Sequence, residues 1–289
     1  MTTVQNAALP ILDTWKDYFL VDRNEGLGSS YERIMLNRKL SELYARYGFR
    51  TALEAPSFGF TGLSGINSLW LAKQHGVAVT VLDTDRERLD LIQGVWQEAG
   101  LTMQPVYAAN FRTLPCGDRS MDFSWNFAAL WFVENLELFF NELTRVTRQV
   151  ILIAVPNRHG LGYQLRKYLA QGEFAKRLNE AYIAPDAIIA HMRQRQWKLV
   201  AWDYIDIPSW PDIAMKKEDF LQLLHAAWLL RLFQKKSGPP ARYAIMDYYT
   251  GKRPDFEAEM LQHAWVEKYA PRWVKYFWAH HKYFVFEPI

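Results

Sequence analysis

Hydrophobic residues recur in two alternating patterns between residues 29 and 157 of this chain. In some stretches they return every three or four positions, which predicts helices; in others they form short continuous or alternating runs, which predict strands. The predicted helices cover residues 29–48, 64–74, 86–99 and 136–147, and the predicted strands cover 51–54, 77–83, 102–108, 121–128 and 149–157. This alternation predicts an α/β fold in which helices cover both faces of a parallel sheet and ligands bind at the carboxyl ends of its strands.

Beyond residue 157 the pattern loosens. Helices are predicted over residues 161–182 and 185–194, a strand over 197–208, and a last strand in HKYFVFEPI. The residues between those two strands have a helical pattern and are very rich in aromatic side chains. A chain of 289 residues is long for one domain and short for two, so we expect one core with a large elaboration. We expect an N-terminal helical segment (1–50), a Rossmann-like cofactor-binding core (51–207), a helical aromatic-rich insertion or lid (208–281) and the last strand of the core sheet (282–289).

Composition restricts the partners and the compartment. The 34 basic and 31 acidic residues are spread along the chain and leave a net charge of +3, so no nucleic-acid partner is expected. Cys116 is the only cysteine, which excludes an internal disulfide and fits a reducing, cytoplasmic location. The N-terminus does not resemble a signal peptide, and no run of 18 apolar residues occurs, so no transmembrane segment is expected.

The stretch from Thr51 to Asp85 has the outline of a nucleotide-type cofactor site. Glu54 ends the first predicted strand, and Gly59 and Gly62 lie in the turn that follows it. Asp83 ends the second strand about 20 residues later, the usual distance for an acceptor of ribose hydroxyls. The turn is not GxGxxG, because EAPSFGFTG has bulky residues where a phosphate-binding loop needs bare backbone. The sequence therefore disfavours a pyrophosphate ligand.

Several further segments, in order, resemble a class I S-adenosylmethionine-dependent methyltransferase of the type-11 small-molecule group, which includes the quinone methylases. Glu54 matches the acid of the first motif, and Asp83 matches the acid that holds the ribose hydroxyls. The segments LPCGDRSMDF, NELTRV and VILIAVPN resemble the family's LPF-D-SFD run leading into the fourth strand, its E-x-x-RV helix and its fifth strand. The first motif departs from acid-x-Gly-x-Gly-x-Gly, and we expect a turn rebuilt around Gly59 and Gly62. The resemblance implies a doubly wound, mostly parallel Rossmann-like sheet with an antiparallel last strand and a helical insertion before it.

The resemblance also implies S-adenosylmethionine as cofactor and a role for each matching residue. Glu54 would bind the methionyl amino group and Asp83 the ribose diol, whereas Asn110 and Phe111 would flank the adenine. Asn126, at the end of the fourth strand, would lie where the methyl group is transferred. Each residue has a plainer alternative: Asp83 as a helix cap, Glu54 as a turn residue, and Asn110 and Phe111 as cover over the core.

Methyl transfer is an in-line displacement that needs a general base only if the nucleophile keeps its proton. The candidates are His159 and Tyr163, which follow VPN, and the adjacent His280 and His281. No metal site is expected, because the seven histidines show neither HExxH nor pairing with carboxylates on a helix face. A hydrolase elbow of the form GxSxG is also absent; Ser64, in GLSG, reads as a helix cap.

The sequence thus favours methyl transfer to a small, apolar or aromatic acceptor. The aromatic insertion is interpreted as core packing, a lid over such a substrate, a homodimer face or a peripheral membrane contact. Two alternatives remain. Pro56 and Phe58 in the first turn motivate a non-catalytic scaffold that has lost or weakened cofactor binding. The acid after the second strand also suits an NAD-type dehydrogenase, although the missing GxGxxG turn argues against it.

Overall fold

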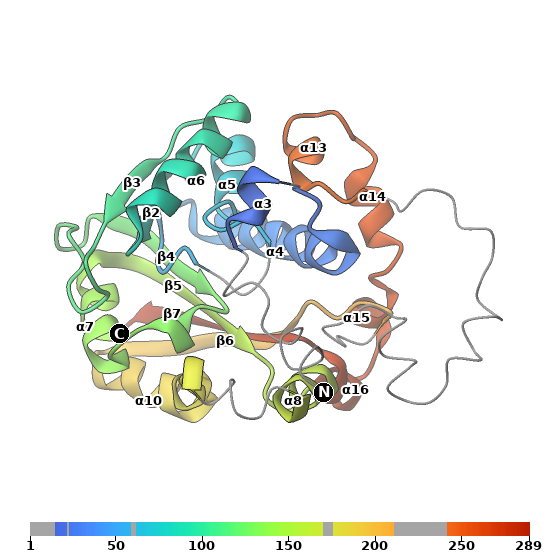
Figure 1. Ribbon diagram of the computed structural model, residues 1–289. Coiled ribbons are helices and arrows are strands. Elements are labelled where there is room, and N and C mark those ends of the chain that lie inside the picture. The colour runs from blue at the N-terminus through green and yellow to red at the C-terminus, as the bar shows by residue number, and fades with distance from the viewer. Residues whose placement is uncertain (1–14, 22, 59–61, 170–175, 211–241) are drawn as a thin grey trace, which may run out of the picture.

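The computed structural model describes residues 15–21, 23–58, 62–169, 176–210 and 242–289. Its centre is a sheet with the strand order β3-β2-β1-β4-β5-β7-β6 (Figure 1). The strands from β3 to β5 run parallel, and β7 is antiparallel to both β5 and β6. The strands are β1 (Thr51–Glu54), β2 (Ala78–Asp83), β3 (Gln104–Tyr107), β4 (Met121–Phe127), β5 (Thr147–Pro156), β6 (Trp197–Ile205) and β7 (His281–Pro288). The mostly parallel sheet with an antiparallel last strand is confirmed.

Helices cover both faces of this sheet, as the alternating pattern predicts (Figure 1). One face carries α4 (Gly26–Tyr47), α5 (Leu69–His75) and α6 (Arg86–Glu98), with α3 (Asp17–Leu20) beside them. The opposite face carries α7 (Leu136–Val146), α8 (Leu161–Leu169) and α10 (Pro185–Gln194). Two short 3-10 helices also occur: η1 (Leu130–Phe132) precedes α7 in the chain, and η2 (Glu180–Ile183) lies between α8 and α10.

The main hydrophobic core extends through the central strands. Side chains on β4 and β5 are buried almost without exception, because both faces of these strands are covered. Phe49 stacks on Phe123 with ring centroids 4.6 Å apart, and Trp125, also fully buried, donates its indole N–H to the Ser68 hydroxyl at 2.9 Å. The core thus fixes the carboxyl ends of β1 and β4 relative to each other.

The turn after β1 is longer than the sequence pattern predicts. The helix expected from Ser64 begins only at Leu69, and Ser64 does not cap it. The intervening chain contains Gly62 and Gly65, which both have positive φ angles, of 59° and 68°, and a helix cannot include such residues. Gly48 ends α4 in the left-handed conformation, as expected of a glycine at that position.

Between β6 and β7 the structure describes four short helices. They are α13 (Ile245–Tyr249), α14 (Phe256–Leu261), α15 (Trp265–Tyr269) and α16 (Arg272–Trp278). Residues 211–241, which belong to the aromatic-rich insertion, lie outside the described residues. The predicted division of the chain into an N-terminal segment, a core, an insertion and a last strand stays a prediction. Among the described helices, none combines the length and the apolar character needed to cross a membrane.

Candidate functional site

Three polar residues end neighbouring strands at the carboxyl edge of the sheet. Glu54 on β1 is in register with Val81 on β2 and with Trp125 on β4, so Asp83 and Asn126 lie just beyond those partners on either side of it. All three side chains are buried, with exposed fractions of 0 or 1%. Because a buried polar side chain needs partners, the contacts of each one indicate what it can bind.

Glu54 faces the start of α5. Its Oε2 accepts a hydrogen bond from the Ser68 backbone N–H at 3.0 Å. Burial raises the pKa of Glu54 to about 7, although the contacts with Ser68 and the more distant charge of Arg33 oppose this rise. Near neutral pH this carboxyl group can therefore change its charge in response to a bound cation such as an amine.

We expect Glu54→Gln to reduce the loss of stability between pH 5 and pH 8 in the cofactor-free protein. The folded-state pKa of about 7 lies above the ordinary glutamate value of 4.5, so the folded state binds the proton more tightly. The stability that this proton provides is complete below the unfolded-state pKa and is lost as the pH rises through about 7. The loss is roughly 3 kcal/mol. Urea unfolding of both proteins at the two pH values measures it, and parallel pH profiles would contradict the prediction.

Asp83 is held by several donors. Its carboxylate accepts from the Arg88 guanidinium through Nη2 at 2.6 Å and Nε at 3.0 Å, from the Ser57 hydroxyl, and from the Asp85 backbone N–H at 2.9 Å. Asp85, and not Asp83, caps α6, because its side chain accepts from the Arg88 backbone N–H at 3.1 Å. The alternative of Asp83 as the helix cap is therefore wrong.

The described part of the turn after β1 is in contact with side chains from the N-terminal region. Glu25 accepts from the Leu63 backbone N–H at 2.6 Å and forms a two-point ion pair with Arg33, both contacts being 2.6 Å. Arg33 also donates to the Leu63 carbonyl oxygen at 2.7 Å. A Cβ at Gly62 would overlap the Glu25 carboxylate, so only glycine fits this position. Gly59 lies outside the described residues.

Asn110 and Phe111 follow β3 on the far side of Asp83. Asn110 is partly exposed, and its Oδ1 accepts from the Arg112 backbone N–H at 2.9 Å. Phe111 is buried and meets Phe139 edge to face, with ring centroids 6.2 Å apart. Their predicted role beside an adenine stays a prediction.

Asn126 differs from the other strand-end residues because its side chain has no hydrogen-bond partner within the described chain. Neither Nδ2 nor Oδ1 is accessible to solvent, and neither is hydrogen-bonded there. Leaving a buried polar group unsatisfied costs about 1 to 3 kcal/mol, so native proteins rarely do so without a reason. A ligand at this edge of the sheet would satisfy the amide.

The two catalytic candidates after β5 have partners of their own. His159 is exposed, and its ring stacks on Tyr276 at 4.7 Å between centroids. Tyr163 is buried and donates its hydroxyl to Glu180 at 2.8 Å; burial and this carboxylate raise the pKa of the phenol. Their catalytic roles stay predictions.

His280 and His281, at the start of β7, both contact Asp206. The Nδ1 atoms of the two rings lie 2.9 Å and 3.2 Å from Asp206 Oδ2. Three further residues of this region did not follow from the sequence pattern: Asp206, Glu25 and Arg88. The adjacent histidines were a visible signal for a cluster, whereas the partners of Glu25 and Arg88 follow only from the tertiary fold.

Comparison with known proteins finds one family that matches part of the chain. Residues 60–153, about a third of the chain, match the family described as "Methyltransferase domain". This match supports the class I S-adenosylmethionine-dependent methyltransferase that the sequence resembles. No curated protein matches the sequence. The match favours the methyltransferase over the dehydrogenase alternative.

Solved structures share the fold of this methyltransferase domain at low sequence identity. An S-adenosylmethionine-dependent methyltransferase from Thermotoga maritima aligns over 100% of both chains with 10% identity and a TM-score of 0.51. A chain in the complex of the Haloferax volcanii Trm112 methyltransferase activator with a methyltransferase aligns over 94% of this chain and 96% of that one, with 13% identity and a TM-score of 0.54. At these identities the likeness concerns the fold alone.

The buried side chains at this edge of the sheet carry the hydrogen-bonding groups that S-adenosylmethionine needs. Asn126 supplies a buried amide that a ligand can complete, and Asp83 supplies a carboxylate for a diol. Arg88 and Ser57 now hold that carboxylate, so ribose hydroxyls would replace one or both of these donors. S-adenosylmethionine supplies the methyl group on a sulfonium centre.

Proposed function

We propose that this methyltransferase domain transfers a methyl group from S-adenosylmethionine to a small, apolar or aromatic acceptor. The observation that supports this most directly is the unsatisfied Asn126 amide at the carboxyl end of β4. In parallel α/β sheets ligands bind at this edge. A structural asparagine in the core would be expected to have partners among its neighbours.

Aromatic side chains gather beyond the same edge and support an apolar or aromatic acceptor. Phe58 packs against Phe132 at 5.2 Å between ring centroids, and Trp131 packs edge to face on Phe132 at 6.0 Å. Phe127, the residue after Asn126, contacts the ring of His281 at 4.4 Å. Aromatic faces attract cations, so such a lining also suits a sulfonium group.

The proposed roles follow the strand ends. Asp83 binds the ribose hydroxyls, Glu54 binds the methionyl amino group, and Asn126 orients the reacting end of the cofactor. Because the transfer is a displacement in line, these contacts act by positioning. The Glu54 carboxylate would pair with the ammonium group in its charged form, which a nearby cation favours.

The substitution Asn126→Leu is expected to have opposite effects on the stability of the protein and on its affinity for the cofactor. We expect the variant to unfold with a free energy about 1 to 3 kcal/mol higher than that of the parent protein, since it removes a buried unsatisfied amide and keeps its approximate volume. We expect its affinity for S-adenosylmethionine to fall at least tenfold. Calorimetric titration and urea unfolding of both proteins test the two effects. A more stable variant that binds the cofactor unchanged would remove Asn126 from the site, and no binding by the parent at millimolar cofactor would favour the scaffold alternative.

We also propose that α15 and α16 contact an anionic membrane surface. Trp265, Tyr269, Trp273 and Phe277 have exposed fractions of 58%, 71%, 69% and 49%. Lys268 and Arg272 are exposed among them, whereas the carboxylate of Glu267 is turned inward to Tyr31. Aromatic side chains interleaved with basic ones are typical of interfacial helices.

Vesicle sedimentation tests this contact. We expect binding to vesicles that contain a third phosphatidylglycerol, weaker binding to pure phosphatidylcholine, and at least a tenfold loss for Trp273→Ser combined with Phe277→Ser. The exposed Leu138→Ser on α7 serves as the control. Concentration-dependent dimers that the double variant abolishes, without vesicle binding, would assign the same face to a homodimer. We place the protein in the cytoplasm, where its free, half-buried Cys116 stays reduced.

A further inference from the structure

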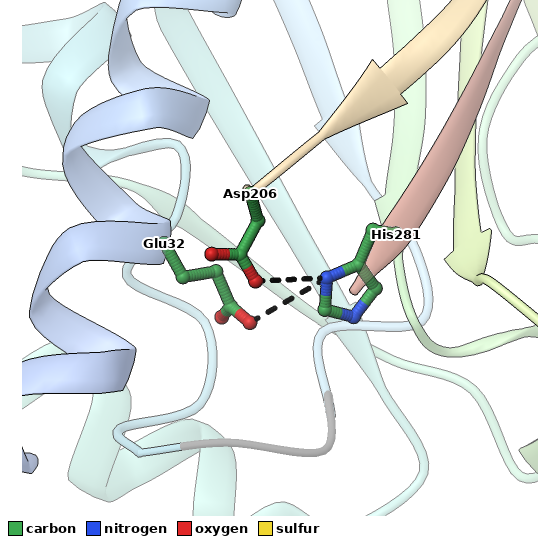
Figure 2. A group of neighbouring side chains, drawn as sticks. All are labelled: Glu32, Asp206 and His281. Atoms are coloured by element: carbon green, nitrogen blue, oxygen red, sulfur yellow. Dashed lines mark hydrogen bonds and ion pairs between the residues drawn. The ribbon is translucent and has the colours of Figure 1, made fainter. Parts of the chain in front are cut away.

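Three ionisable side chains from distant parts of the chain converge beside the carboxyl edge of the sheet (Figure 2). Glu32 lies on α4, Asp206 follows β6, and His281 begins β7. One potential ligand atom from each residue lies within 4.8 Å of the other two. All three residues are buried, with exposed fractions of 6%, 1% and 8%. We call this group the Glu32–Asp206–His281 cluster.

The distances in the cluster are close to those between ligands of one metal ion. His281 Nδ1 lies 3.2 Å from Asp206 Oδ2 and 3.8 Å from Glu32 Oε2. Two ligands that bind one ion at about 2.1 Å are roughly 3.0 to 3.4 Å apart in octahedral or tetrahedral arrangements. The first distance already lies in this range and the second exceeds it by a few tenths of an ångström, while the ligand atoms of Glu32 and Asp206 lie within 4.8 Å of each other.

One oxygen of the Asp206 carboxylate has no hydrogen-bond partner in the described chain. Asp206 Oδ2 accepts from both histidines, but Asp206 Oδ1 is buried and has no hydrogen-bond partner there. Figure 2 shows the Asp206 and Glu32 carboxylates next to each other, both facing the same nitrogen of the His281 ring. Asp206 also has a φ of 62°, in the left-handed region that a non-glycine residue adopts at a cost. The backbone thus directs a carboxylate into a buried cluster that leaves one of its oxygens unsatisfied.

The neighbouring carboxylates of Glu32 and Glu267 interact with the charges of Arg33 and Lys275, but neither cation forms a described ion pair with Asp206. Glu267 lies close by, and its carboxylate accepts from the Tyr31 hydroxyl at 2.9 Å and from the Ile207 backbone N–H at 3.0 Å. The described ion-pair partners of Asp206 are the two histidines, whose rings are charged only when protonated. Buried carboxylates need compensation by a cation or by several hydrogen bonds.

We propose that Glu32, Asp206 and His281 bind one divalent metal ion. Two carboxylate oxygens and one imidazole nitrogen suit Mn²⁺, Fe²⁺ or Zn²⁺ better than Ca²⁺, which prefers oxygen ligands alone. Coordination through His281 Nδ1 requires that nitrogen to be deprotonated, so the neutral imidazole would carry its proton on Nε2 in the metal-bound form. The ion would lie at the same edge of the sheet as Asn126, since His281 pairs with Pro156 at the end of β5 and touches Phe127.

Metal titration of the full chain tests the proposal without any assay of methyl transfer. The protein is stripped with a chelator, dialysed, and titrated with MnCl₂ while free Mn²⁺ is followed by electron paramagnetic resonance; ZnCl₂ is titrated by calorimetry. We expect one saturable site per chain and a higher melting temperature with metal. Asp206→Asn, Glu32→Gln and His281→Gln should each weaken Mn²⁺ binding at least tenfold.

The matched control is Glu42→Gln, which removes an exposed carboxylate from the same helix. It should bind Mn²⁺ as the parent does. Should a cluster variant fail to fold by circular dichroism, the stoichiometry and melting shift of the parent protein decide the question. Absence of saturable binding by the parent, or unchanged binding by folded Asp206→Asn, would overturn the proposal and leave the cluster as a hydrogen-bonded network of Asp206 and the two histidines.

Discussion

Replacing Arg33 with methionine is expected to lower the free energy of unfolding by about 3 to 5 kcal/mol, because it leaves the buried Glu25 carboxylate without its ion partner. Both side chains of this pair are buried, with exposed fractions of 2% and 0%. For a chain of this size the loss corresponds to a fall in melting temperature of roughly 6 to 20 °C. The variant also loses the hydrogen bond to the Leu63 carbonyl oxygen, so the turn after β1 loses order with it.

Calorimetric or circular-dichroism melting of three variants measures the effect of the pair. The double variant Glu25→Gln with Arg33→Met removes both charges and should recover part of the stability. Arg38→Met, an exposed residue on the same helix whose partner is Glu257, should change the free energy by less than about 1 kcal/mol. Equal losses from Arg33→Met and Arg38→Met would show that the buried pair does not stabilise the turn.

Asp83→Asn is expected to weaken S-adenosylmethionine binding roughly a hundredfold or more. The carboxylate can accept hydrogen bonds from both ribose hydroxyls, and a hydrogen bond to a charged group contributes about 1.5 to 3 kcal/mol. Asparagine keeps the size of the side chain but offers one acceptor and a competing donor. Isothermal titration with the cofactor and with S-adenosylhomocysteine measures the loss.

The matched control for this change is Asp85→Asn. Asparagine caps a helix as well as aspartate does, so α6 should keep its start and the cofactor affinity should stay within about twofold. Melting curves establish that both variants fold. Identical dissociation constants for Asp83→Asn and the parent would mean that Asp83 serves only the ion pair with Arg88.

The sequence predicted the order of strands and helices because burial in a parallel sheet leaves a strong local pattern. β5 is a continuous apolar run, and α6 has a regular apolar face, so each could be recognised by itself. The start of α5 was wrong by several residues. Nothing local shows that the turn after β1 continues to Ser68, since the contact of that residue with Glu54 joins positions 14 apart.

The candidate site was predictable only as far as its residues lie at strand ends. Glu54, Asp83 and Asn126 follow from the ends of β1, β2 and β4, and the register brings them to one edge. The residues that occupy the site from elsewhere were not predictable. Glu25 and Leu63 are 38 positions apart, and Asp206 and His281 are 75 positions apart. Before the fold is known, each polar residue could pair with many others at such separations, so the sequence does not identify the partner.

β7 is the last strand of the sheet to be synthesised, so the sheet can be completed only after all its other strands have been translated. This strand lies between β5 and β6, yet it follows both in the chain, after the whole insertion. When the chain has been synthesised only up to Ile205, β5 and β6 are complete, but β7, which pairs with both of them, does not yet exist. Unpaired edges of this kind favour pairing with other chains, and late non-local pairing slows folding. A peptide with the sequence of β7, added during refolding, should therefore compete for the open slot and trap molecules short of the native sheet.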